Sequence, residues 1–269
     1  MKAFETKEVL LSVKNVNKSY GDNVILRDIN FEIMNLIRPD VTNQGQIVSL
    51  IGKSGSGKST LFRLIAAIEN GYTGSILRFD KSELDLPNIM ESICEGDMGV
   101  VFQNSYVYPW RKVSKILSMA AEKNTVEIDI NYYVDILSLK EHLNKYPSEL
   151  SGGQRQRVAL AEQIVNGGQF ILLDEPFSGL DAPTIDKVTN VLTKIVQEDE
   201  RKTIILISHD LSNSLAISDT AFILAKEGDK PGSTITNKIC LASMGLAWEI
   251  GIKENPEFRN LLSYVKQQL

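Results

Sequence analysis

A glycine-rich segment between residues 50 and 61 carries residue types that can bind a chain of phosphates. Gly52, four further residues and then Gly57-Lys58-Ser59 match the pattern G-x-x-x-x-G-K-[ST]. Glycines let backbone N–H groups turn toward a polyphosphate without a clash from Cβ atoms. Lys58 is expected to reach the β- and γ-phosphates, and the Ser59 hydroxyl to hold Mg²⁺. The pattern predicts a nucleoside triphosphate site built from Gly52, Ser54, Gly55, Ser56, Gly57, Lys58, Ser59 and Thr60.

Two carboxylates and a histidine follow two further apolar runs, at residues 170–173 and 204–207. Such runs predict strands buried on both faces, whose ends lie at the carboxyl edge of a parallel sheet, where ligands bind. Asp174 suits the coordination shell of Mg²⁺. Glu175 could polarise the attacking water as a general base, unless the two carboxylates merely cap the strand in solvent. His209 could hydrogen-bond the γ-phosphate and orient that water.

A second anion site is predicted at Ser151, Gly152 and Gly153, which open a helical pattern. The phosphate loop of a monomer already encloses its single γ-phosphate. A second phosphate-binding helix end therefore suggests that two chains enclose ATP between them.

The elements that must position these residues follow from hydrophobic periodicity. Alternation at 9–16 and 25–33 predicts antiparallel strands, and residues 34–45 are expected to form a loop. Helical spacing is predicted for 58–69, for much of 113–146 and for 255–269, the last docked on the core or binding a partner. Further strands are expected at 47–51, 74–79, 98–102, 170–173, 203–207 and 221–225. The result is an α/β core interrupted by an all-helical insertion.

Composition narrows the class of protein. The 269 residues are 43% apolar and 23% charged, with a net charge of −5, which argues against a general nucleic-acid binder. No apolar run approaches the roughly 20 residues that cross a bilayer, and the N-terminal residues lack the apolar core of a signal peptide. The chain is therefore expected in the cytoplasm. Cys94 and Cys240 are expected to be reduced structural thiols, and His142 a surface residue.

Leu150 followed by Ser151-Gly152-Gly153-Gln154 resembles the signature of ATP-binding cassette (ABC) ATPases, and the motif order agrees with that family from about residue 9 to 225. The resemblance implies a P-loop NTPase core with an antiparallel β subdomain in one domain, 1–269. A helical subdomain is expected at about 104–150 and a divergent tail at about 226–269. The family forms head-to-tail dimers, in which Ser151 and Gly153 of one chain would contact the γ-phosphate held by Lys58 of the other.

The same resemblance assigns roles that the residues alone would not. Gln103 matches the glutamine that meets Mg²⁺ and the attacking water and links the core to the helical subdomain. Asp181 ends Ser178-Gly179-Leu180-Asp181, which resembles the loop connecting the two sites of the dimer. Tyr20 matches the aromatic residue on which adenine stacks, although by itself it would be an aromatic residue in a turn. ATP and Mg²⁺ are the implied ligands.

Residues 104–111, with Pro109-Trp110, resemble the corresponding stretch of importers of the nitrate, sulfonate and taurine type. This implies an ATPase subunit on the cytoplasmic face of the membrane, working with separate permease subunits and a substrate-binding protein, and not with nucleic acid. Tyr106, Tyr108 and Trp110 are expected either to form that interface or to pack locally. An exporter or lipid-transport cassette, or a soluble ABC ATPase acting on nucleic acid or ribosomes, remains the alternative. Glu162 departs from the family, since Ala161-Glu162-Gln163 stands where Ala-Arg-Ala is common.

Overall fold

The computed structural model describes residues 5–37, 44–79, 90–104, 106–124, 128–200, 202–249 and 251–269. Half of the loop predicted at 34–45, residues 38–43, lies outside these residues. No helix in the described ranges is long and apolar enough to cross a membrane.

Ten strands of the described chain form one mixed sheet in the order β5-β4-β1-β2-β10-β9-β3-β8-β7-β6. Strands β1, β2, β4 and β5 pair antiparallel, whereas β9, β3, β8, β7 and β6 are parallel neighbours. The strands are β1 (Glu5–Tyr20), β2 (Asn23–Ile37), β3 (Gln46–Ile51), β4 (Thr73–Phe79), β5 (Met90–Ser92), β6 (Met98–Val101), β7 (Phe170–Asp174), β8 (Thr203–Ser208), β9 (Thr220–Lys226) and β10 (Ser233–Cys240).

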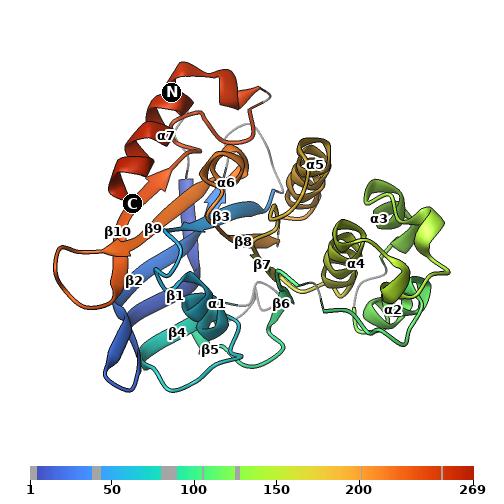
Figure 1. The fold of residues 1–269 in the computed structure, drawn as a ribbon, viewed down its shortest axis with the longest axis horizontal. Coiled ribbons are helices and arrows are strands. Elements are labelled where there is room, and N and C mark those ends of the chain that lie inside the picture. Colours follow the sequence, from blue (N-terminus) through green and yellow to red (C-terminus); the bar gives the residue numbers. More distant parts are fainter. Residues whose placement is uncertain are drawn as a thin grey trace.

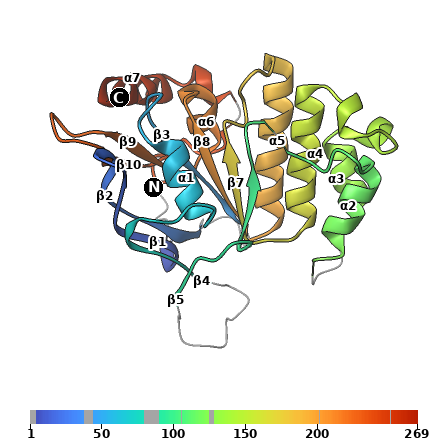
Figure 2. The same ribbon diagram turned by 60° about the horizontal axis from the view of Figure 1, so that its bottom comes forward.

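Helices cover both faces of the sheet, and a helical lobe of α2, α3 and α4 extends beyond its β6 edge (Figures 1 and 2). Side chains of β8 show the two faces, because Ile205 and Ile207 pack in the cluster with α1, while Ile204 and Leu206 pack with α4 and α5. The helices are α1 (Lys58–Ile65), α2 (Val113–Ala121), α3 (Ile130–Ile136), α4 (Gly152–Val165), α5 (Ala182–Glu198), α6 (Leu211–Ile217) and α7 (Pro256–Gln268), with short 3₁₀ turns at Lys140–His142, Pro147–Glu149 and Ile252–Glu254.

The α/β class with an antiparallel part and a helical insertion is confirmed, but several boundaries differ from the sequence prediction. Strand β2 continues through Met34 to Ile37, so the predicted loop is wrong there; Met34 pairs with Val9, and Leu36 is buried. The helix predicted at 58–69 ends at Ile65, and Ala67 adopts a positive φ of 53°. The segment 113–146 breaks into α2, α3 and a 3₁₀ turn.

Two strands were not predicted, β5 and β10. Strand β10 alternates weakly because Thr, Asn and Lys occupy it, and of its side chains only Ser233 and Ile239 are buried. It nevertheless lies between β9 and β2 and joins the two halves of the sheet. The C-terminal helix α7 packs as expected, with Phe258, Leu261 and Val265 buried against α6 and β9.

The structure also shows the surroundings of Cys94, Cys240 and His142. Cys94 and Cys240 are free thiols as expected, but Cys94 is exposed and contributes nothing to the core. His142 is half-buried. Burial lowers its pKa, and the charges of Lys145 and Arg157 lower it further.

Candidate nucleotide-binding site

The phosphate loop connects β3 to α1 at the carboxyl edge of the parallel strands. Gly55 and Gly57 have φ of +78° and +87°, a region that favours glycine. Lys58 is buried, and its Nζ donates to the backbone oxygens of Gly52 at 2.8 Å and Lys53 at 2.9 Å. Burial lowers the pKa of Lys58, while the charges of Glu175 and Asp174 oppose this shift. The loop thus curls around the ammonium group.

A cavity of about 470 Å³ opens on this loop. Its walls come from five separate segments of the chain, so the structure brings together residues as far apart in the sequence as Ile25 and His209. Gly52 and Ser56, by contrast, do not line it. The lining residues are Ile25, Ser54, Gly55, Gly57, Lys58, Ser59, Thr60, Gln103, Asp174, Glu175 and His209.

Asp174 and Glu175 reach the cavity because β7 ends there. Burial and then the charge of Glu175 raise the pKa of Asp174, while Arg63 and Lys58 act in the opposite direction. A cation between these groups would reverse that balance and favour the carboxylate.

Glu175 is held by the segment that follows β8. Its backbone has φ +52°, and its N–H donates to Ile207 O at 2.8 Å. Its carboxylate accepts hydrogen bonds from Ser208 Oγ at 3.1 Å and His209 N at 3.1 Å, and His209 Nδ1 lies 2.9 Å away. These contacts fix the orientation of the carboxylate, which lines the cavity. Because Nδ1 of His209 faces the carboxylate, the other ring nitrogen, Nε2, points away from Glu175.

The oxygen atoms around Ser59, Gln103 and Asp174 suit Mg²⁺, which prefers one or two carboxylates together with substrate phosphates. No cluster of three His, Cys, Asp or Glu side chains in the described part of the chain could hold a metal ion alone. The donor set therefore fits an ion that arrives with phosphates. The side chain of Gln103 is held in place by a hydrogen bond, because its Nε2 donates to Ser178 Oγ at 3.2 Å.

The signature residues lie apart from this cavity, at the N-terminus of α4. Ser151 caps the helix in a reciprocal pair: its Oγ accepts from Gln154 N at 3.3 Å, and Gln154 Oε1 accepts from Ser151 N at 2.9 Å. A Cβ on Gly152 would meet nothing within 4 Å, and one on Gly153 would meet only the Leu180 side chain, at 3.3 Å. Packing within this chain therefore gives no reason for a glycine at position 152.

Asp181 and Tyr20 also lie outside the lining of the cavity. Asp181 is the N-cap of α5, and a hydrogen bond with Thr184 lowers its pKa. Tyr20 is 48% exposed, and its hydroxyl bonds to Glu69. The buried Lys18 places its Nζ 4.9 Å from the Tyr20 ring centroid and 2.8 Å from Glu69 Oε1.

Sequence reasoning missed Lys18, Glu69 and Ser208, which support the site residues, and it did not foresee the contact of Ser178 with Gln103. Ser208 adjoins His209, and position alone could have suggested it. Lys18 and Glu69 lie 51 residues apart, so only the paired structure reveals their contact.

A family model for ABC transporters matches residues 41–178, slightly more than half of the chain. The chain belongs to the ABC transporter family. It is an ATP-binding cassette, and the cassettes of this family are ATPases.

Several import and transport proteins resemble the cassette. The maltose/maltodextrin import ATP-binding protein of Mannheimia succiniciproducens is 36% identical over 223 residues, which are 81% of this chain and 56% of that protein. The glutamine transport ATP-binding protein of Geobacillus stearothermophilus is 35% identical, covering 76% and 82%. The aliphatic sulfonates import ATP-binding protein of Bacillus cereus is 31% identical, covering 84% of each. The cassette thus spans little more than half of some relatives and most of others.

Solved cassettes share the fold. The ATP-binding cassette MJ0796, in a dimeric post-hydrolysis state with ADP and Pi, superimposes with a TM-score of 0.65 at 25% identity, covering 86% of this chain and 99% of that one. The expected ABC ATPase fold is confirmed.

Gly52 tests how the loop is anchored to the sheet. A Cβ there would lie 2.5 Å from Leu224 O of β9 and from Ser56 Oγ. Gly52→Ala should therefore lower the free energy of unfolding by about 2–3 kcal/mol. Gly55→Ala is the matched control, because its Cβ would meet nothing within 4 Å and only the positive φ costs about 1 kcal/mol. Equal losses for the two variants in urea denaturation would contradict this account.

Proposed function

We propose that the cassette hydrolyses ATP as the motor subunit of an ABC transporter and works as a head-to-tail dimer. The observation that carries this proposal is the division of the phosphate-binding groups. The cavity at Lys58 gathers every predicted catalytic residue, whereas Ser151–Gly153 do not line it, and a Cβ on Gly152 would meet nothing within 4 Å. A second copy bringing its α4 N-terminus to this cavity would complete the site.

In this proposal the β- and γ-phosphates replace Gly52 O and Lys53 O as acceptors of the Lys58 ammonium group. Ser59, Asp174 and Gln103 would hold Mg²⁺, which supplies neutralisation of the phosphate charge. Glu175 accepts a proton from the attacking water as a general base. His209, hydrogen-bonded to Glu175, orients that water and the γ-phosphate.

The partner chain supplies electrostatic stabilisation. The first turn of α4 has N–H groups without partners in the helix and the positive end of its dipole, which favour an anion. Directed at the γ-phosphate, these donors would stabilise the charge that develops during in-line attack. Tyr20 would stack on adenine, with Lys18 and Glu69 holding its ring.

Glu175→Gln tests the assignment of the general base. The amide keeps the shape of the side chain but cannot take the proton, so turnover should fall by about 10²–10⁴-fold. ATP binding should persist, and an ATP-bound dimer should accumulate in size-exclusion chromatography. Glu257→Gln, on the exposed face of α7, is the control and should leave turnover unchanged. A variant that stays monomeric with Mg²⁺ and ATP, or turns over at a near-normal rate, would refute the assignment.

Gly152→Ala tests the role of the second chain. Because the chain itself leaves open space there, and alanine favours helix over glycine by about 1 kcal/mol, the isolated cassette should be as stable as the parent or slightly more so. ATP-driven dimerisation and turnover should nevertheless fall at least tenfold. Gly168→Ala, whose Cβ would meet only Phe170 O at 3.8 Å, should change neither. Full activity of Gly152→Ala would argue against completion of the site in trans.

Transport is the function to which we assign this hydrolysis, with the cassette on the cytoplasmic face of a membrane and bound to separate permease subunits. Support comes from the relatives, whose names specify import of maltose/maltodextrin or aliphatic sulfonates, or transport of glutamine. The exposed rings of Tyr106, Tyr108 and Trp110 on the helical lobe side offer a docking surface. Import of a small anion such as nitrate, sulfonate or taurine, with a substrate-binding protein, is our preferred assignment.

Capture from detergent-solubilised membranes of the source cells separates the alternatives. The tagged cassette should retain a multi-span permease, whose genetic neighbours would identify the substrate. Recovery of ribosomes or DNA in place of a permease would favour a soluble ABC ATPase, and a permease with exporter topology would favour export.

A further inference from the structure

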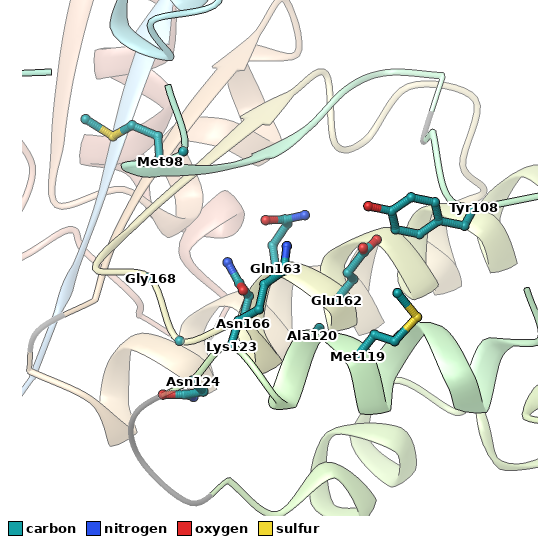
Figure 3. Close-up of a pocket in the computed structure, with 12 residues that line it drawn as sticks. Met98, Tyr108, Met119, Ala120, Lys123, Asn124, Glu162, Gln163, Asn166 and Gly168 are labelled. Carbon is teal, nitrogen blue, oxygen red and sulfur yellow. The ribbon is translucent and has the colours of Figure 1, made fainter. Parts of the chain in front are cut away.

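A second cavity, of about 560 Å³, lies on the helical side of the molecule, away from the nucleotide site. Helices α2 and α4 and Tyr108, from the segment between Gln103 and α2, form its walls (Figure 3). None of its lining residues lines the cavity at Lys58.

Glu162 is the unusual group in this cavity. It lies half-buried on α4 and points toward Tyr108 (Figure 3), and its carboxylate forms no hydrogen bond or ion pair of 4 Å or less within the described chain. Burial raises the pKa of Glu162 to about 7, and the charge of Lys123 offsets only part of this effect. Lys123 itself is exposed and follows the end of α2. The carboxylate is therefore held in a partly dry place without a direct counter-ion.

The other walls suit a cation. Tyr108 offers an aromatic ring, and Met119 a thioether, both of which attract or tolerate a charged nitrogen with an apolar stem. Gln163 and Asn166 add amide oxygens. A lysine or arginine side chain combines such a stem with such a charge.

The mouth of the cavity continues into exposed aromatic residues. Tyr108 contacts Trp110 with ring centroids 5.9 Å apart, and Trp110 is 67% exposed. Tyr106, which is 76% exposed, lies two residues before Tyr108. Exposed Tyr and Trp side chains are enriched in protein interfaces, as is Arg, which favours a macromolecular occupant with a basic side chain over a free small cation.

We propose that this cavity receives a lysine or arginine side chain from a cytoplasmic loop of the permease, which pairs with Glu162 while the loop lies on Tyr106, Tyr108 and Trp110. This rests on the proposed function. The occupant would contact α4, which begins at the signature, and the segment that follows Gln103. A basic side chain there would connect the permease to both parts of the nucleotide site.

The half-buried, unpaired carboxylate of Glu162 also destabilises the free cassette, and a cation in direct contact would remove that cost. Tyr108 and Lys123 are the other titratable side chains among the described lining residues, and neither forms an ion pair with Glu162. Because the pKa of Glu162 is higher in the folded chain than in the unfolded chain, the loss of stability is absent at pH values below the pKa of the unfolded chain. The loss grows as the pH rises toward 7. Glu162→Gln should therefore raise Tm by about 2–4 °C at pH 8, with no gain at pH 4.

The decisive experiment measures binding to the permease recovered from solubilised membranes. A photo-crosslinking residue at Tyr108 should attach to a cytoplasmic loop within a few residues of a lysine or arginine. Glu162→Gln should weaken binding of that permease at least tenfold at pH 8, and Glu162→Arg should abolish it. Changing the basic residue of the loop to glutamate should restore binding of Glu162→Arg. Glu141→Gln, an exposed acid on the same lobe, is the matched control.

The outcomes separate the two proposals. A permease that binds wild type and Glu162→Gln equally leaves the transport function standing and overturns this inference. A crosslinked loop without a basic residue does the same. If wild type captures no multi-span protein, the transport function fails, and this inference fails with it.

Discussion

The matched register of three parallel strands is the constraint on which the nucleotide site depends. Leu50 of β3 lies opposite Ile207 of β8, and Ile207 lies opposite Asp174 of β7. Because the three strands are buried and level at their carboxyl ends, their loops leave the sheet side by side. The phosphate loop, the two carboxylates and His209 meet for this reason. A slip of one residue in β7 would turn Asp174 to the opposite face of the sheet.

Once the strands are aligned, local contacts set the reactive groups. Glu175 follows its strand at a positive φ, which is tolerated because its N–H bonds to Ile207 O and its carboxylate accepts from Ser208 and His209. Neighbouring strands thus fix the orientation of a residue that the sequence can only place at a strand end. Gln103 is fixed in a similar way, by Ser178 from a different loop.

The sequence was most informative where chemistry and periodicity agree. Lys58, Asp174 and His209 each come shortly after a largely apolar run, so both the element and the site residue could be predicted. Prediction failed where pairing rather than burial sustains a strand. Strand β10 carries Thr, Asn and Lys, and it exists because β9 lies beside it, which no local pattern reveals. The Tyr20 contacts with Lys18 and Glu69 were likewise hidden, because they join a strand to the segment after α1.

The join made by β10 has a mechanical consequence. Its ladder to β9 is long, but its only parallel pair with β2 in the described chain is Ser233 with Leu26. The sheet therefore consists of two parts that meet at a seam with little backbone pairing. The rings of Phe31 and Phe222 pack across this seam with their centroids 4.8 Å apart. Tyr20, at the end of β1, belongs to one part of the sheet, and β3 belongs to the other. Side-chain contacts, among them the Arg27–Glu227 ion pair at 3.0 Å, therefore contribute more than backbone pairing to the spacing between Tyr20 and the phosphate loop after β3.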